Sequence, residues 1–419
     1  MIGVRREDKN RWERRVPLTP DHIAELARRG IDVTVESSRI RVFPDDAFRR
    51  AGARVAEGLG GAPLVFGVKE IPVGKLHAGT AYAFFAHVAK GQPANMPMLR
   101  RLMALDCTLI DYEKIVDDRG RRLVFFGRHA GYAGMIDTLW ALGRRFAAEG
   151  IDSPFASIEL AHDYENLESA HVALGRVADA MRRDGVPENL HPLVFGFTGS
   201  GNASKGAQEI FDRLPYEEVL PEDLPRQISN RDLPRNLLYK VLFSRADRFE
   251  GGMASYLPFL TVLVNGVHWE PGHPRVVSLD DLKALWKDGS APRLRVIGDV
   301  SCDIGGSIEA TVRRTTPGDP VFVYDVTAGG AISGIAGHGP TILAVDNLPC
   351  ELPVDASQHF GDALLRFVPA MARCDWSQPL EGQDLPEEIA RVVVLHRGRL
   401  TPTFRYLERH LAAVEGRTA

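Results

Sequence analysis

Residues 193–211 read Leu-Val-Phe-Gly-Phe-Thr-Gly-Ser-Gly-Asn-Ala-Ser-Lys-Gly-Ala-Gln-Glu-Ile-Phe. The apolar run at 193–197 predicts a buried strand, and Gly199 and Gly201 predict a tight turn directly after it. Helix-forming residues follow from about Ser204. A strand, a glycine-rich turn and a helix in this order can hold a dinucleotide pyrophosphate. The glycines let backbone N–H groups approach the phosphates, and the positive end of the helix faces their charge.

The glycine spacing departs from the G-x-G-x-x-G pattern at one position. Ser204 stands where the third glycine is expected, and Gly206 follows two residues later. Because glycines also occur in turns that bind nothing, an ordinary strand-to-helix turn is the alternative interpretation.

Length and composition narrow the class of protein. With 419 residues the chain exceeds one ordinary hydrophobic core, so two domains are expected. An apolar content of 44% and a charged content of 25% are typical of a soluble globular protein, and the net charge of −4 argues against general nucleic-acid binding.

We expect no membrane segment, because no apolar run reaches the length of a span. The N-terminus is charged where a signal peptide is apolar. The cysteines are scattered, which predicts reduced thiols in a cytoplasmic protein.

Short apolar runs alternate with helical patterns along most of the chain. The runs that predict strands lie at 33–36, 64–68, 81–86, 108–112, 193–197, 294–299 and 321–324. Apolar residues at helical spacing over 134–150 predict a helix that could join two domains. The alternation predicts an α/β fold with parallel sheets.

Polar side chains follow two of the predicted strands, at the edge where parallel sheets bind ligands. Lys69 and Glu70 come after one strand, and His87 comes after the next. A partly desolvated lysine and a histidine can both transfer protons near neutral pH. A surface Lys–Glu pair and a structural histidine are the alternatives. Two such groups after neighbouring strands favour catalysis more than either group alone.

Arginines near predicted turns supply positive charge for anionic ligands, because a guanidinium group can fork onto a carboxylate. Arg15 precedes a proline-containing turn, and Arg121 and Arg122 lie in a turn before Phe126. Glu113 follows another predicted strand and could tune the pKa of the lysine. Solvated surface charge and a charged hairpin-like turn are the alternatives. No H-E-x-x-H or C-x-x-C pattern predicts a metal site, and no G-x-S-x-G motif predicts an acyl-transfer serine.

These blocks together resemble the lysine–2-oxoglutarate reductase (saccharopine-forming) family, found as a domain of the bifunctional lysine-degrading enzyme. That family is related to the fungal saccharopine dehydrogenases and, further off, to alanine dehydrogenase. The motifs at 197–208 and at 345–349 (Val-Asp-Asn-Leu-Pro) are the most specific. The similar stretches are 5–20, 67–72, 82–96, 109–134, 195–214, 263–270, 299–309 and 345–369.

The resemblance implies two Rossmann-like domains with parallel sheets and an active-site cleft between them. It implies a catalytic domain at 1–134, an NAD(P)-binding domain at 135–345 and a C-terminal segment at 346–419 that returns to the first domain.

The resemblance also implies roles for individual residues. Lys69 and His87 fall on the family's acid–base pair, and Glu70 and Glu113 fall on acidic residues beside the catalytic lysine. Substrate-binding positions are Arg15, Gln92, Arg122, Phe126 and, on a looser local match, Asn265. Cofactor-binding positions are Arg121, Gly199, Ser200, Gly201, Asn202, Val345, Asp346, Asn347 and Leu348.

The implied reaction condenses L-lysine with 2-oxoglutarate to saccharopine using NAD(P)H, or runs in reverse. The expected partners are these small molecules, and a homo-oligomer is open. The mammalian-type reductase uses NADPH, which favours NADP. The expected second strand of the nucleotide domain, near 217–220, is followed by both Glu222 and Arg226, which leaves NAD open.

Two other functions remain open. An opine-type dehydrogenase, or an alanine dehydrogenase relative, would keep Lys69, His87 and the glycine turn but act on another amine and 2-oxo acid. A non-catalytic dinucleotide-binding sensor is expected to have lost Lys69 or His87, and both are present.

Overall fold

The computed structural model describes residues 1–230, 232–245, 247, 252–287 and 292–415. The chain forms two compact units. Unit 1 comprises Met1–Phe125 and Pro353–Ala419, and unit 2 comprises Phe126–Leu352. The chain therefore leaves the first unit at 125/126 and returns at 352/353, whereas the sequence placed these points at 134/135 and 345/346.

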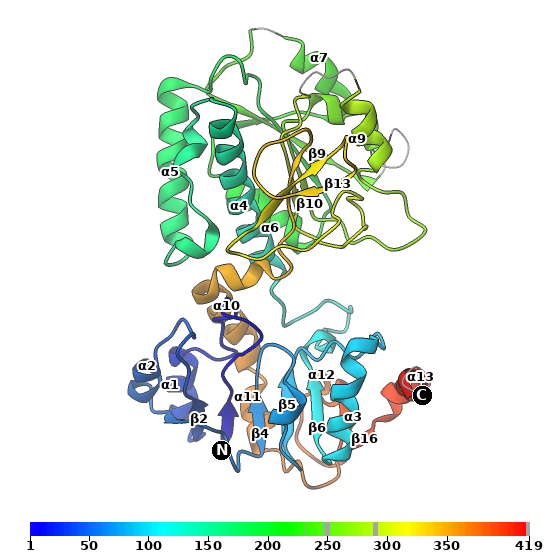
Figure 1. Cartoon of the computed structure of the whole chain (residues 1–419). Helices are drawn as coiled ribbons and strands as arrows, with labels where there is room; N and C mark the ends of the chain where they lie inside the picture. Colours follow the sequence, from blue (N-terminus) through cyan, green and yellow to red (C-terminus); the bar gives the residue numbers. More distant parts are fainter. Residues whose placement is uncertain (231, 246, 248–251, 288–291, 416–419) are drawn as a thin grey trace. The chain divides into compact units, whose positions relative to one another are not determined.

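Unit 1 contains a sheet in the order β16-β15-β6-β5-β4-β1-β2-β3 (Figure 1). Its strands are β1 Ile2–Val4, β2 Val33–Glu36, β3 Arg54–Ala56, β4 Leu64–Phe66, β5 Ala81–Phe84, β6 Thr108–Asp111, β15 Val393–His396 and β16 Arg399–Leu400. The strands from β3 to β6 run parallel. β15 pairs antiparallel with β6, so the returning segment adds its strands to this sheet.

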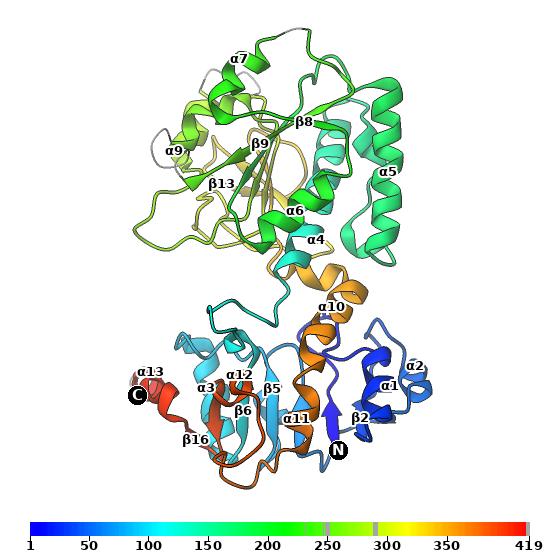
Figure 2. The same cartoon turned by 180° about the vertical axis from the view of Figure 1, so that it is seen from behind.

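The helices of unit 1 come from both parts of the chain. They are α1 Pro20–Arg28, α2 Asp45–Arg50, α3 Met96–Ala104, α10 Pro353–Leu365, α11 Val368–Arg373, α12 Glu387–Ala390 and α13 Glu408–Glu415. Figure 2 shows α10 and α11 along one side of the unit. Phe360 of α10 packs against Phe85 and Tyr112, with ring centroids 5.8 and 5.2 Å away. This aromatic contact ties the returning segment to the loops that follow β5 and β6.

Unit 2 contains a second sheet in the order β13-β12-β14-β11-β10-β7-β9-β8. Its strands are β7 Val194–Thr198, β8 Tyr216–Glu218, β9 Leu238–Phe243, β10 Val262–Asn265, β11 Val296–Asp299, β12 Val321–Asp325, β13 Gly330–Ile332 and β14 Thr341–Leu343. The strands from β8 to β14 in this order are parallel, and β12 and β13 extend the sheet antiparallel.

Helices cover both faces of this sheet (Figure 1). On one face, α4 Gly127–Ala148, α5 Leu167–Asp184 and α6 Asn202–Phe211 enclose a core that includes Leu142, Phe195 and Phe211. On the other, α7 Leu224–Ile228 and α9 Leu279–Leu285 contribute to a second core with Tyr239 and Trp286. Among the described helices, none is long and apolar enough to cross a membrane.

The α/β fold with parallel-rich sheets is confirmed in both units, and the predicted strands lie within a few residues of the observed ones. The expected second strand of unit 2 is confirmed, but the strand order does not support its use for choosing between NAD and NADP. The second strand of unit 2 does lie near 217–220, as β8, but it sits at the edge of the sheet. The place beside β7 belongs to β9, so residues after β9, and not Glu222 or Arg226, follow the strand next to the glycine turn.

Candidate functional site

The residues expected to move protons follow neighbouring parallel strands of unit 1. Lys69 and Glu70 follow β4, His87 follows β5 and Glu113 follows β6. Because the carboxyl ends of parallel strands meet at one edge of the sheet, these side chains are gathered at the edge where ligands bind in such folds. The predicted adjacency of the strands that precede Lys69 and His87 is confirmed, and the catalytic role of these residues stays a prediction.

Lys69 is held at this edge by a buried carboxylate. Glu7 accepts the backbone N–H groups of Val68 (2.7 Å) and Lys69 (3.0 Å). Burial raises the pKa of Glu7 to about 7, against the opposing charge of Arg5. These bonds fix the backbone from which the lysine side chain extends.

The pKa of Lys69 lies below its ordinary value. Burial is the largest cause, and the positive charges of Arg15 and Lys9 act in the same direction. Glu13 and Glu70 oppose the shift without reversing it. The sequence left open whether burial or the nearby glutamates would dominate, and burial does. A neutral amine is therefore more accessible at Lys69 than at an exposed lysine.

His87 is oriented by Glu70. The distance from His87 Nδ1 to Glu70 Oε1 is 2.7 Å, and Lys9 Nζ lies 3.3 Å from the other carboxylate oxygen. Burial acts to raise the pKa of Glu70, but the hydrogen bond with His87 and the charge of Lys9 outweigh it and lower the pKa to about 2. Since an ionised carboxylate only accepts hydrogen bonds, Nδ1 is the donor, and Nε2 is the nitrogen that can exchange a proton.

The backbone at His87 is also unusual. Its backbone φ is +51°, a left-handed conformation that residues other than glycine seldom adopt. The His87 ring stacks on Phe85 at 6.0 Å, and Asn95 donates to the His87 carbonyl at 3.1 Å. Strained positions of this kind occur often at functional sites.

Gln92, an expected substrate contact, is exposed, and its amide oxygen accepts from the same Asn95 side chain at 3.3 Å.

Arg15 forms a bidentate ion pair with Glu13. The distances are 2.7 Å from Nε and 2.6 Å from Nη2 to the two carboxylate oxygens, and both residues are buried. This pair holds the guanidinium group in a fixed orientation near Lys69 and adds to the local positive charge that lowers the lysine pKa. The sequence singled out Arg15 but not its partner.

Arg121 and Arg122 lie in a hairpin-like turn closed by a bridge between Val116 and Arg122. Arg121 is exposed and donates to Asp117 at 2.7 Å. Arg122 is about half exposed and donates to Glu113 at 2.7 Å, so the structure joins two residues that were selected separately. The geometry matches the surface-turn alternative for Arg121, and its role toward the cofactor stays a prediction. Phe126 is buried at the start of unit 2, directly before α4.

Asp111 was not singled out from the sequence, although it ends β6 beside Glu113. Its side chain is buried, and burial raises its pKa to about 6. One carboxylate oxygen accepts the backbone N–H of Glu113 at 3.0 Å. The feature of the sequence that could have identified Asp111 is an acidic residue at the end of a mostly apolar strand.

The glycine turn of unit 2 has the geometry needed for a close approach of phosphate. Gly199 has a φ of +88°, and a Cβ there would lie 2.5 Å from the Gly266 carbonyl oxygen, so only glycine fits. A Cβ at Gly201 would meet open space. Helix α6 begins at Asn202, which directs its first N–H groups toward the turn that contains Ser200. The turn therefore fits a dinucleotide pyrophosphate.

Gly206 explains the imperfect glycine motif. A Cβ at this position would overlap the backbone carbonyl of Arg128 in α4. Gly131 of α4 lies equally close to α6, against the carbonyl of Ala203. The third glycine thus serves close helix–helix packing two residues later than the pattern predicts, and Ser204 is buried beside Gly266.

Asn265, at the end of β10, is fully buried within a polar network. Its amide nitrogen, with two N–H donors, lies 2.8 Å from oxygen atoms of Asp299, Ser301 and Ser307, and its amide oxygen accepts from Thr198. The residue joins the ends of neighbouring strands in unit 2. These contacts give it a positioning role, and its expected contact with substrate stays a prediction.

The segment expected at the nicotinamide, Val345–Leu348, enters the 3-10 helix Leu348–Glu351. Val345 and Leu348 are buried, Asp346 lies 3.2 Å from Arg314, and the N–H of Cys350 donates to the carbonyl of Asn347.

Glu351 and Asp137 of α4 are both fully buried acids. Burial raises the pKa of Glu351 to about 8, and burial with the nearby Glu351 raises that of Asp137 well above normal.

Replacing Glu351 with glutamine is expected to flatten the pH dependence of stability. A carboxyl with a raised pKa is protonated in the folded protein but ionised in the unfolded chain between the unfolded value of 4.5 and about 8. Its stabilising effect is therefore full at low pH and is lost as the pH rises toward 8, at up to ~1.4 kcal/mol per pH unit. Thermal unfolding of the wild type and E351Q between these limits measures the difference in slope. Identical slopes would contradict the prediction.

Two family models match the chain. The model described as alanine dehydrogenase/PNT, N-terminal domain, matches residues 3–133. The model described as alanine dehydrogenase/PNT, C-terminal domain, matches residues 261–403. Together they cover more than half of the chain and reach into both units.

Solved structures share the fold. An L-alanine dehydrogenase covers 98% of this chain and 99% of its own length, with a TM-score of 0.65 and 20% identity. A transhydrogenase from Sinorhizobium meliloti covers 96% and 99%, with a TM-score of 0.56 and 15% identity. At these identities the likeness establishes the fold.

Curated relatives match nearly all of the chain in sequence. Alpha-aminoadipic semialdehyde synthase of Rattus norvegicus, described as mitochondrial, is 36% identical over 98% of this chain and 48% of its own length. The Arabidopsis thaliana synthase is 35% identical over 98% of this chain and 41% of its own length. The chain therefore spans about half or less of these relatives. Saccharopine dehydrogenase [NAD(+), L-lysine-forming] of Neurospora crassa is 28% identical over 87% of this chain and 89% of its own length. The chain is a homologue of these enzymes and belongs to the alanine dehydrogenase/PNT family of NAD(P)-binding dehydrogenases.

Proposed function

We propose that this chain is an oxidoreductase that condenses L-lysine reductively with 2-oxoglutarate to give saccharopine, or catalyses the reverse reaction. The side-chain amine of lysine adds to the keto carbon, water leaves, and the resulting imine is reduced to a secondary amine. The bound NAD(P)H supplies the hydride. The observation that carries the proposal is the partly buried Lys69 with a lowered pKa beside the Glu70–His87 pair, in a homologue of alpha-aminoadipic semialdehyde synthase and of lysine-forming saccharopine dehydrogenase.

Lys69 and His87 divide the proton transfers in this proposal. Attack on the keto carbon requires a neutral amine, and loss of water requires a proton donor. Lys69 can act in its neutral form because burial and neighbouring cations favour it. His87 can exchange a proton at Nε2 while Glu70 holds Nδ1. The reaction also requires the coenzyme, for which the glycine turn at Gly199 supplies the cradle.

The substrate carboxylates need cationic partners, and unit 1 provides two. Arg15 is buried and fixed by Glu13, which suits a preorganised contact. Arg122 is more exposed and pairs with Glu113, so its guanidinium group can exchange this carboxylate for one from the substrate. We assign Arg122 to 2-oxoglutarate.

Replacing Arg122 with alanine is expected to raise the KM for 2-oxoglutarate by roughly 10-fold or more, because one charged hydrogen bond to the keto acid is lost. The kcat should change less, since Arg122 takes no part in proton transfer. Arg119→Ala, at an exposed position of the same turn, is the matched control and should leave this KM within about twofold. An unchanged KM in R122A would assign the residue to the surface.

The function is tested by following the loss of reduced-nicotinamide absorbance with lysine plus 2-oxoglutarate. Ammonia and ornithine replace lysine, and pyruvate replaces 2-oxoglutarate, in parallel reactions. The proposal predicts the highest kcat/KM for lysine with 2-oxoglutarate. A higher value for another pair would favour an opine-type or amino-acid dehydrogenase. Coenzyme binding without turnover on any pair would favour a sensor.

We also propose a reducing compartment such as the cytoplasm, because Cys107, Cys302, Cys350 and Cys374 are all free thiols and the first three are buried. Assembly into a homo-oligomer stays a prediction.

A further inference from the structure

The strand order of unit 2 decides which residues lie near the adenosine ribose of a bound dinucleotide. In a dinucleotide-binding sheet, the residues that follow the strand beside the glycine turn face the ribose of the adenosine half. Here that strand is β9, which pairs with β7 along its whole length, from Val194 opposite Tyr239 to Thr198 opposite Phe243. Ser244 and Arg245 come directly after β9. An arginine therefore stands where an acidic residue would favour NAD.

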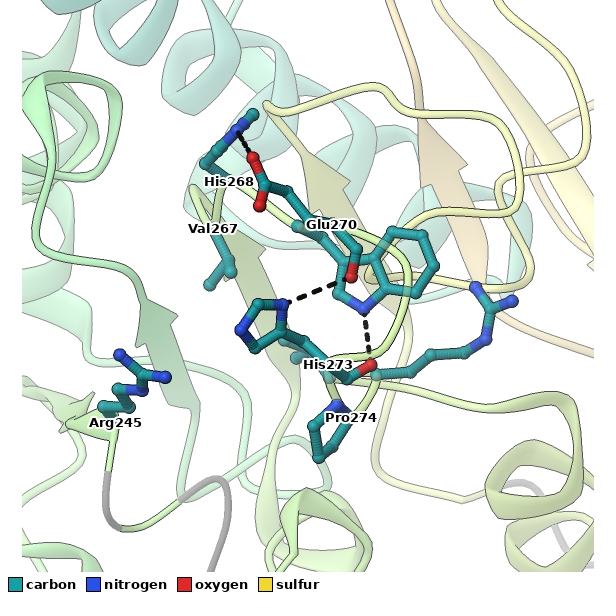
Figure 3. Close-up of a pocket in the computed structure, with 9 residues that line it drawn as sticks. Arg245, Val267, His268, Glu270, His273 and Pro274 are labelled. Carbon is teal, nitrogen blue, oxygen red and sulfur yellow. Dashed lines mark hydrogen bonds and ion pairs between the residues drawn. The ribbon is translucent and has the colours of Figure 1, made fainter.

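A cavity of about 280 Å³ opens at this same end of the sheet (Figure 3). Arg245, from the end of β9, lines it on one side. The segment 267–276, which follows β10, lines it on the other. Since β10 pairs with the opposite side of β7, the cavity lies where the chain order reverses across the sheet. Ligands bind at such reversal points in open α/β sheets.

Basic side chains outnumber acidic ones in the lining of the cavity. Arg245, Arg275, His268 and His273 face a single acid, Glu270, which lies 3.4 Å from His268 Nε2. Arg275 packs on the ring of Trp269 at 4.9 Å and is anchored on the carbonyls of Gly305 and Gly306. Arg275 also lies 3.7 Å from Glu309, so an anionic group entering the cavity would meet one arginine that is already held in place, Arg275, and a second, Arg245, at the end of β9.

The loop that follows β10 is internally braced, which preserves the shape of the cavity. Trp269 Nε1 donates to the His273 carbonyl at 2.9 Å, and His273 Nδ1 lies 3.3 Å from the Glu270 carbonyl (Figure 3). On the other side, the carboxylate of Asp247 accepts the Ser244 N–H at 2.6 Å. This acid near β9 is therefore engaged with the backbone at the strand end, which limits its use as a partner for ribose hydroxyls.

We propose that this cavity binds the 2′-phosphate of NADP, with Arg245 as the residue that selects NADPH over NADH. The inference rests on the proposed coenzyme-dependent reduction, and it names the residue that decides which coenzyme is used. A 2′-phosphate is a dianion that pairs well with a guanidinium group, whereas the 2′-hydroxyl of NAD gains little from one.

The test is direct binding of NADPH and of NADH, followed by nucleotide fluorescence without lysine or 2-oxoglutarate. The wild type is expected to bind NADPH more tightly. Arg245→Ala should weaken NADPH binding by roughly 10- to 100-fold, the loss of one charge-assisted contact, and leave NADH within about twofold. Arg226→Ala, on exposed α7 where the sequence first suggested a reader, is the matched control and should change neither.

Competition with 2′,5′-ADP and 5′-ADP separates the phosphate from the rest of the nucleotide. In the wild type 2′,5′-ADP should displace NADPH at lower concentration than 5′-ADP, and in R245A this advantage should disappear. Equal loss of NADPH and NADH binding in R245A, or no loss of either, would overturn the proposal. Because no substrate is present, absence of lysine-dependent turnover would count against the proposed reaction and leave this result intact.

Discussion

Lys69→Met is expected to reduce turnover of lysine and 2-oxoglutarate by roughly 10²–10⁴-fold, the range of one lost general acid–base group. The methionine side chain keeps a similar volume in this partly buried position but cannot carry a proton. Burial and the charges of Arg15 and Lys9 lower the lysine pKa, which makes proton exchange the role most suited to this residue. Steady-state kcat with the preferred coenzyme measures the loss, and coenzyme binding should persist.

Two further variants separate proton transfer from charge. Lys69→Arg keeps a positive charge that does not dissociate, so it should be nearly as inactive as Lys69→Met if the neutral amine is required. Lys283→Met, at an exposed position of α9, is the control and should retain full activity. A loss of less than about tenfold in K69M would remove the lysine from the mechanism. Recovery of activity in K69R would reassign it to charge stabilisation.

Gly131→Ala is expected to destabilise unit 2 by at least ~2–3 kcal/mol. The added Cβ of α4 would overlap the Ala203 carbonyl and lie 2.6 Å from the Ala207 backbone nitrogen of α6. Backbone atoms within a helix cannot move aside as the end of a flexible side chain can, so the two helices must separate. The change in free energy of unfolding is measured by urea denaturation of the wild type and the variant.

Gly175→Ala makes the same substitution where space is open. Gly175 lies within α5, and a Cβ there meets no atom within 4 Å. Alanine favours a helix interior by ~0.5–1 kcal/mol over glycine, so this variant should be slightly more stable than the wild type. The two substitutions thus differ in sign. A neutral or stabilising G131A would mean that α4 and α6 are packed less tightly than described.

The parts of the fold that could be read from the sequence are those with a local signal. Strands buried on both faces appear as short apolar runs, and this identified β4 through Leu64 and β6 through Leu109. The groups after their carboxyl ends could then be located without knowing any pairing. For this reason Lys69, His87 and Glu113 were assigned to one edge from the sequence alone.

The features that were missed depend on contacts between distant residues. The position of β9 between β8 and β7 is a matter of pairing order, and no local pattern encodes it. The run at Leu238–Phe243 was itself a detectable signal, with Lys240 interrupting it. That lysine is buried and donates to Asp212 at 2.7 Å. Because Lys240 interrupts the apolar run, the sequence analysis did not identify β9, the strand beside the glycine turn.

Ion pairing in the candidate site likewise escaped a reading of single residues. Glu13 lies two residues from Arg15, yet only the structure shows that both of its carboxylate oxygens bind one edge of the guanidinium group, at Nε and Nη2. Asp111 lay within the strand predicted at 108–112, and it ends the observed β6. Both cases concern acids whose effect depends on burial, a property set by the surrounding fold.

The discontinuity of unit 1 has a consequence for biosynthesis. A ribosome releases the polypeptide from the N-terminus, and domains generally fold as complete units. Unit 2 is one uninterrupted stretch, Phe126–Leu352, and is available in full before α10, α11 and the strands β15 and β16 emerge. Until then β6 is an edge strand, and its unpaired main-chain N–H and C=O groups can pair with a strand of another chain. Nascent chains stalled between these stages should therefore be the species most in need of a chaperone.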